Sequence, residues 1–148
     1  MAVAKLTSDD IRLFLQDRPE LNTLMDGVRW EEKDIEQAQI MCCAYFNESP
    51  PRINTFQFTV ESFPFTYCML MFVAGYLLRS AAINQASNNL TYSADGISVN
   101  DSDKAQIFTD LGKDMQAEAK KMIQDIKIQK NIENAYGGKG SEFAWLVR

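Results

Sequence analysis

The chain has 148 residues, the length of one ordinary domain that can bury a core without disulfides or metals. Hydrophobic residues make up 46% and charged residues 24%, a globular composition that excludes a disordered chain. A formal net charge of −5 argues against broad binding of nucleic acid, which requires clustered lysine and arginine. An acidic surface that faced DNA would repel its backbone and favour passage over attachment.

Histidine is absent, and the three cysteines show no pattern of a disulfide or metal site. Without histidine the chain lacks the usual general base and the commonest metal ligand. Cys42 and Cys43 are adjacent, Cys68 makes the count odd, and no Cys-x-x-Cys spacing occurs. We therefore expect three reduced core thiols in a chain folded in the cytosol, and no catalytic residue, metal or cofactor.

The N-terminal stretch predicts a short helix and a connector. Residues 1–5 lack the apolar core of a signal peptide. Thr7 or Ser8 can cap a helix that has aspartates in its first turn and ends before Pro19. Residues 19–27 then read as a turn followed by a short helical piece.

Residues 30–47 predict the first long helix, with apolar residues every three or four positions. Trp30 at its entrance is expected to anchor in the core rather than to offer a stacking surface. Glu32 and Glu36 lie one turn apart and could form a carboxylate pair. Because no histidine or third carboxylate accompanies them, we interpret them as residues of a solvated face.

An apolar helix is predicted over residues 65–88, after Pro50 and Pro51 break the preceding helix. Residues 53–58 are expected to be extended, and Phe56 and Phe58 alternate with polar neighbours, so that one face of the segment could be buried. Residues 63–78 are uncharged but shorter than the ~20 residues that span a bilayer, so a buried core helix is the better interpretation. Its sulfur-containing residues are assigned to packing rather than to a soft-metal site, namely Cys68, Met69 and Met71.

Residues 90–100 predict a β-hairpin between the two longest helices. Four apolar residues alternate with polar ones, and Asp95-Gly96 suits a tight turn. A lone two-stranded ribbon is marginal in water, so it must lean on the helices or on a neighbouring subunit. Its apolar residues are therefore candidate contact residues: Leu90, Tyr92, Ile97 and Val99.

A long helix is predicted from Asp101 or Ser102 to about Ala135. Gly112 weakens it by about 1 kcal/mol relative to alanine without ending it. At ~34 residues it would be about 50 Å long, so part of it should project or be covered by partners. Its apolar stripe is predicted to consist of Phe108, Leu111, Met115, Ala119, Met122 and Ile126.

The glycine-rich residues 137–141 predict a hinge to an apolar tip. They lack a preceding strand and the spacing of a phosphate-binding loop. The tip must fold back or dock elsewhere, and its candidate contact residues are Phe143, Trp145 and Leu146. The predicted fold is thus mainly α: one helical domain over residues 1–136, with a β-hairpin at about 90–100, and a flexible arm over 137–148.

The order of elements over residues 70–135 resembles the head-to-tail connector, or adaptor, proteins of tailed bacteriophages. An apolar, alanine-rich helix precedes the run Tyr-Ser-Ala-Asp-Gly-Ile-Ser-Val at residues 92–99, and a helix rich in lysine and glutamine follows it. The resemblance covers a little under half of the chain, and residues 1–62 contribute nothing to it.

This resemblance implies a structural virion protein rather than an enzyme. Its members are small helical subunits that form a ring, typically of twelve, beneath the portal protein. The ring joins the portal to the tail or nozzle and extends the channel, through which DNA passes without sequence-specific binding. The implied location is the neck of the virion, after assembly in the host cytoplasm and without a membrane. C-terminal arms commonly dock onto the portal.

Two other classes of function fit the same sequence. One is another phage neck or tail-completion protein that docks to a different ring. The other is a small cytoplasmic helical module that binds a partner helix in a groove. An enzyme is the weakest alternative, because a site built from aspartate, glutamate and lysine alone would need a pocket that sequence does not reveal.

Overall fold

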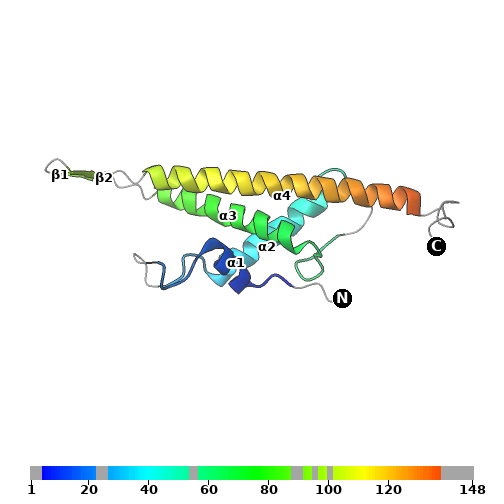
Figure 1. Ribbon diagram of the computed structural model, residues 1–148, viewed down its shortest axis with the longest axis horizontal. Coiled ribbons are helices and arrows are strands. Elements are labelled where there is room, and N and C mark those ends of the chain that lie inside the picture. Colours follow the sequence, from blue (N-terminus) through cyan, green and yellow to red (C-terminus); the bar gives the residue numbers. More distant parts are fainter. Residues whose placement is uncertain are drawn as a thin grey trace.

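The computed structural model describes residues 5–22, 27–53, 57–87, 92–94, 97–99 and 102–137. Its helices are α1 (Ser8–Leu15), α2 (Glu32–Glu48), α3 (Thr66–Ser87) and α4 (Ser102–Gly137). The two long helices α3 and α4 run antiparallel and side by side, α2 crosses them, and α1 lies on the other side of α3 from α4 (Figure 1).

Helix α1 begins and ends where local hydrogen bonds allow. The Thr7 hydroxyl accepts a hydrogen bond from the Asp10 amide at 3.2 Å, and the Asp10 carboxylate accepts one from the Thr7 amide at 2.9 Å. The helix ends at Gln16, whose left-handed φ of 55° closes its last turn. Of the two predicted capping residues, Thr7 and Ser8, the cap is therefore Thr7, and the predicted end before Pro19 is confirmed.

A buried carboxylate ties the end of α1 to the start of α2. Asp17 accepts hydrogen bonds from the amides of Arg29 at 2.7 Å and Trp30 at 3.1 Å, and from the Asn22 side chain at 2.7 Å. These bonds satisfy backbone groups that burial would otherwise leave unpaired. They also hold Trp30 in the core, where it is 6% exposed, so its predicted role as an anchor is confirmed.

Helix α3 is the centre of the core. Side chains on most of its circumference are buried against α2, α4 and the segment before it. The three cysteines are free and buried, as expected of reduced core residues. A helix that is apolar all round can be stable in this way only when other elements surround it.

The backbones of α3 and α4 touch at two glycines. A Cβ atom at Gly75 would lie 2.8 Å from the carbonyl oxygen of Gly112 and 2.9 Å from the amide nitrogen of Gln116. A Cβ atom at Gly112 would lie 3.0 Å from the carbonyl oxygen of Gly75. Only glycine fits at these positions, so Gly112 is a contact point and not merely a weak position in the helix.

The predicted apolar stripe of α4 is partly wrong. Ala119 is fully buried as expected, but Leu111 is 46% exposed. Because Gly112 lies against α3, the most buried residues of α4, apart from Ala119, are those one position after the residues predicted to be buried. This buried stripe consists of Gly112, Gln116, Ala119, Ile123 and Lys127.

The predicted fold class needs a correction in its β part. Of residues 90–100 the structure describes Tyr92–Ala94 (β1) and Ile97–Val99 (β2), which pair antiparallel with Tyr92 opposite Val99. These three residue pairs lie beyond the ends of α3 and α4 (Figure 1). They are therefore not packed into the helical fold as a β-hairpin. A two-stranded ribbon gains stability only from such packing, so the fold is mainly helical without a β-hairpin as one of its elements.

The domain limits can be compared with the structure only in part. Helix α4 runs through Gly137, two residues beyond its predicted end near Ala135. The remainder of the predicted arm, residues 138–148, lies outside the described residues.

Replacing Gly75 by alanine should separate α3 from α4. Alanine raises helix propensity by about 1 kcal/mol. We expect the clash with the Gly112 carbonyl to outweigh this gain and to lower the free energy of unfolding by about 1–3 kcal/mol. Urea denaturation of Gly75→Ala measures the effect, and Ser80→Ala on the exposed side of α3 is the control, expected to be neutral or slightly stabilising. An unchanged or higher midpoint for Gly75→Ala would contradict the glycine contact.

Candidate functional site

The residues predicted from the sequence to make contacts are described only in part. Tyr92, Ile97 and Val99 lie in the two short strands, where the pairing brings Tyr92 opposite Val99. Leu90 and the three residues of the C-terminal tip, Phe143, Trp145 and Leu146, lie outside the described residues. All seven therefore remain predictions.

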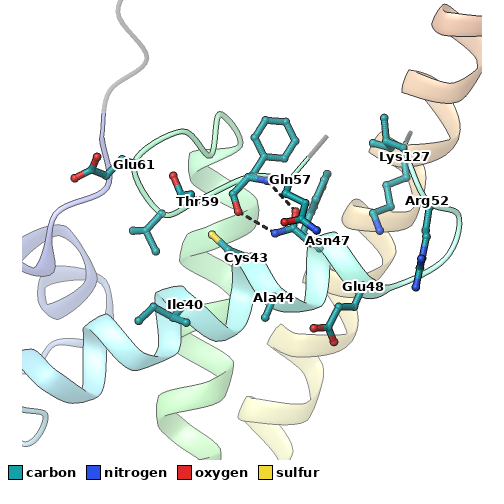
Figure 2. A pocket seen from close by; sticks show the side chains of 14 residues that line it. Ile40, Cys43, Ala44, Asn47, Glu48, Arg52, Gln57, Thr59, Glu61 and Lys127 are labelled. Carbon is teal, nitrogen blue, oxygen red and sulfur yellow. Dashed lines mark hydrogen bonds between the residues drawn. The ribbon is translucent and has the colours of Figure 1, made fainter. Parts of the chain in front are cut away.

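A groove of about 750 Å³ opens between α2 and the segment over residues 57–61 (Figure 2). The Asn47 side chain holds this segment to α2: it donates to the carbonyl oxygen of Phe58 and accepts from the Phe58 amide, both at 2.9 Å. Ile40 and Cys43 on α2 and Val60 opposite them make much of the wall apolar. The charged groups of the lining are Glu48, Arg52, Glu61 and Lys127.

Four phenylalanines form the floor behind this groove. The ring of Phe46 lies 5.5 Å from that of Phe58, 5.2 Å from that of Phe63 and 5.8 Å from that of Phe65, measured between centroids. The pairs with Phe58 and Phe63 are edge-to-face and the pair with Phe65 is stacked, and both arrangements add to the stability gained by burial alone. The prediction that Phe58 lies on a buried face is in keeping with this packing, whereas the cluster itself has no sequence periodicity that could reveal it.

Lys127 is a buried cation at the end of the groove. Its side chain is 1% exposed, and its ammonium donates hydrogen bonds to the carbonyl oxygen and, at 3.0 Å, the hydroxyl of Ser49. It also lies 5.0 Å from the centroid of the Phe46 ring, a cation–π contact. Among the described residues no carboxylate lies within 4 Å of it. Burial lowers the pKa of Lys127, and the nearby charge of Arg52 lowers that pKa further.

The thiols beside the groove are not activated for chemistry. Burial raises the pKa of Cys43 to about 11 and that of Cys68 to about 12, so both are protonated at neutral pH. The part of the chain that the structure describes has no cluster of three or more cysteine, aspartate or glutamate residues that could hold a metal ion. Glu32 and Glu36 are exposed, as predicted, and Glu32 accepts hydrogen bonds from Arg12 at 3.2 Å and from Ser8.

Large apolar side chains remain exposed in several places among the described residues. The first, which we call the α4 outer patch, comprises Ile107, Leu111, Ile128 and Ile132, each between 43% and 56% exposed. The other exposed apolar residues are Leu13, Phe14, Leu21, Val28, Ile40, Tyr67 and Ile83. The sequence pattern placed Leu111 in the core and did not reveal the α4 outer patch, because residue type alone does not distinguish a half-exposed apolar side chain from a buried one.

Among the described residues, α3 is the one helix long and apolar enough by length and composition to cross a membrane. In the most apolar window of this helix, 56% of the residues are buried inside the molecule. This packing agrees with the predicted core role of residues 65–88.

No family model, no curated protein and no solved structure matches this chain.

The lowered pKa of Lys127 should make stability depend on pH. Between its folded pKa and the higher unfolded value, the unfolded chain binds more protons, so the free energy of unfolding rises with pH. We expect wild type to gain stability relative to Lys127→Met as pH rises from neutrality toward the ordinary lysine pKa. Urea denaturation over this range measures the difference between the two proteins. Lys130→Met, which removes an exposed partner of Glu133, should show no such gain, and a pH-independent difference for Lys127→Met would contradict the prediction.

The raised thiol pKa values should protect the cysteines from alkylation. At pH 8 the folded chain is expected to take up iodoacetamide slowly at all three thiols, because burial suppresses the reactive thiolate. In urea the three thiols should react within the time expected for free cysteine. Mass spectrometry of the adducts measures both rates, and rapid labelling of folded Cys43 would show that the groove exposes a reactive thiol.

Proposed function

We propose that this chain is a structural subunit of the head-to-tail connector of a tailed bacteriophage. In this proposal, copies form a ring, typically of twelve, that joins the portal to the tail or nozzle in the neck of the virion. The ring extends the channel, and DNA passes through it without sequence-specific binding. The function is structural and requires no cofactor.

The observation that carries this proposal is the long α3–α4 pair with apolar side chains exposed on its outer side. Helix α4 has 36 residues and is about 54 Å long, more than a compact domain of this size needs. The α4 outer patch consists of one apolar pair toward each end of the helix, Ile107 with Leu111 and Ile128 with Ile132. Exposed apolar side chains along an element of this length favour protein–protein assembly over a small-molecule site.

Charge supports the same proposal. A net charge of −5 suits the wall of a channel that must let DNA pass and must not retain it. The thiols of Cys43 and Cys68 are protonated, and the buried lysine of the groove, Lys127, is held by hydrogen bonds to Ser49. A structural role fits these features better than a catalytic one.

A second candidate, a small helical module that binds a partner helix, is favoured by the groove beside α2. Its apolar wall and aromatic floor have the character of a helix-binding surface. A neck or tail-completion protein that docks to another ring would share the fold and differ only in its partner. Crosslinking from Trp145 to each candidate partner separates these possibilities.

The connector proposal predicts assembly that depends on a template. We expect the purified chain to be monomeric or loosely associated by light scattering. Mixed with the portal protein encoded in the same genome, it should add a ring that electron microscopy can resolve. Phe143→Ala with Trp145→Ala should abolish attachment but leave the circular dichroism spectrum unchanged, because the core described above lies within residues 5–137. A tight dimer that forms without the portal would contradict the proposal.

A further inference from the structure

We propose that the C-terminal tip, residues 142–148, binds as an extended strand in the groove beside α2 of the same molecule. This inference goes beyond the connector proposal, which requires only that the tip leave the groove when it meets the portal. It gives the groove an occupant other than the partner helix of the second candidate function. The tip itself lies outside the described residues, whereas the groove is described along its length.

The groove is long enough to hold a short extended segment. Beside the hollow of about 750 Å³ lies a second one of about 530 Å³, and Ile40, Val60 and Glu61 line both. The two hollows therefore form one continuous groove. Four residues along one face of α2 line it: Glu36, Ile40, Cys43 and Asn47. From the first to the last of these the distance along the helix is roughly 17 Å.

The two ends of the groove differ in charge, with Glu61 at one end and Arg52 and Lys127 at the other (Figure 2). The end nearer to α4 carries two cations and one carboxylate, namely Arg52, Lys127 and Glu48. The opposite end carries three carboxylates and one ammonium, namely Glu32, Glu36, Glu61 and Lys5. Arg12 already pairs with Glu32 at 3.2 Å, whereas Glu36 and Glu61 form no ion pair within the described part of the chain.

The tip carries its own charges in the complementary order. Glu142 comes first, Arg148 comes last, and the five residues between them are uncharged. An extended strand sets these two charges about 20 Å apart, close to the length of the groove. With Glu142 at the positive end beside Arg52, Arg148 therefore reaches the carboxylates at the negative end. Complementary charges of this kind fix the direction in which a segment binds.

The side chains of the tip alternate as a groove with one apolar wall requires. In an extended strand one side presents the larger apolar residues, Phe143, Trp145 and Val147, and the other side presents Ala144 and Leu146. With Glu142 at the positive end, Trp145 lies about 10 Å further along, level with Ile40. Ile40 is 50% exposed, so an indole ring placed there buries apolar surface on both partners.

The connection from α4 is long enough for the tip to reach the groove of its own chain. Lys127 lies ten positions before Gly137 on α4, or roughly 15 Å along the helix. The five residues from 138 to 142 span about 17 Å when extended. Glycines at 138 and 140 allow the chain to reverse its direction sharply. Glu142 can therefore return to the level of Lys127 without the help of a second copy.

Paramagnetic broadening of amide signals in the full-length chain tests this contact. Because the three native cysteines are buried, a nitroxide label attaches selectively to Ala144→Cys, on the side of the tip that faces away from the groove. In an isotope-labelled chain that carries this label, we expect the amides of Ile40, Cys43 and Val60 to lose most of their signal intensity. Unchanged intensities at these three amides would overturn the proposal.

A mixed sample distinguishes the chain's own groove from that of a second copy. Half of the molecules carry only the nitroxide and the other half carry only the isotope, so that broadening reports contacts between molecules. We expect the three amides to keep their intensity in this mixture. Broadening as strong as in the doubly labelled chain would place the tip in another molecule and would also overturn the proposal.

Substitutions in the labelled chain test the alternation of side chains. Trp145→Ala should restore most of the lost intensity, because it removes the side chain expected to contact Ile40. Leu146→Ala, on the opposite side of the same strand, is the matched control and should leave the broadening unchanged. An equal effect of the two substitutions would contradict binding as an extended strand.

A charge exchange tests the direction of the tip. Arg52→Glu should weaken the broadening, because it places a carboxylate beside Glu142. Glu142→Lys added to the same chain should strengthen the broadening again, an effect that a merely structural role of Arg52 would not produce. A double variant that stays as weak as Arg52→Glu would overturn the proposed placement.

The same measurements separate this inference from the connector proposal. Broadening in the groove of a chain that never attaches to the portal would support the contact and refute the connector. Rings on the portal, built from a chain whose free subunit shows no broadening, would refute the contact and support the connector.

Discussion

The contact between the backbones of Gly75 and Gly112 determines how the two longest helices pack, and most of the fold follows from it. It fixes the separation and the rotation of α4 on α3, and so decides which side of α4 is buried. Because Gly112 faces α3, Gln116, Ala119 and Ile123 follow it into the core. The same rotation turns Leu111 toward solvent. The contact of α4 with α3 thus also determines which residues of α4 are exposed.

Much of the helical fold could be predicted from the sequence, since capping residues, prolines and apolar periodicity act locally. The Thr7 cap and the Trp30 anchor are examples. The rotation of α4 could not be predicted in this way, because a glycine in a helix has the same sequence signature whether it weakens the helix or touches a neighbour. The opposite error concerns the predicted β-hairpin: alternation of apolar and polar residues favoured one as an element of the fold, whereas the fold is mainly helical without it.

The groove beside α2 was beyond sequence reasoning for a related reason. Its cation, Lys127, lies on a helix whose lysines otherwise face solvent, and only the fold brings it to Ser49, 78 positions earlier in the chain. The Asn47 clamp on Phe58 likewise joins a helix to an irregular segment, where no periodic pattern exists. Residues whose partners are distant in sequence carry little local signal, and the polar contacts of this groove are of that kind.

The contact of α3 and α4 at the two glycines also affects the direction of α4. From Gly112 to Gly137 the helix extends for 25 residues, or roughly 38 Å. A tilt of about 10° at the glycine contact would move the far end of α4 by roughly 7 Å, enough to change which residues of a neighbouring molecule it meets. The close backbone contact at Gly75 and Gly112 restricts such a tilt, because no side chain separates the two helices there. Two residues without a side-chain carbon, Gly75 and Gly112, therefore fix the direction of α4, the longest helix of the structure.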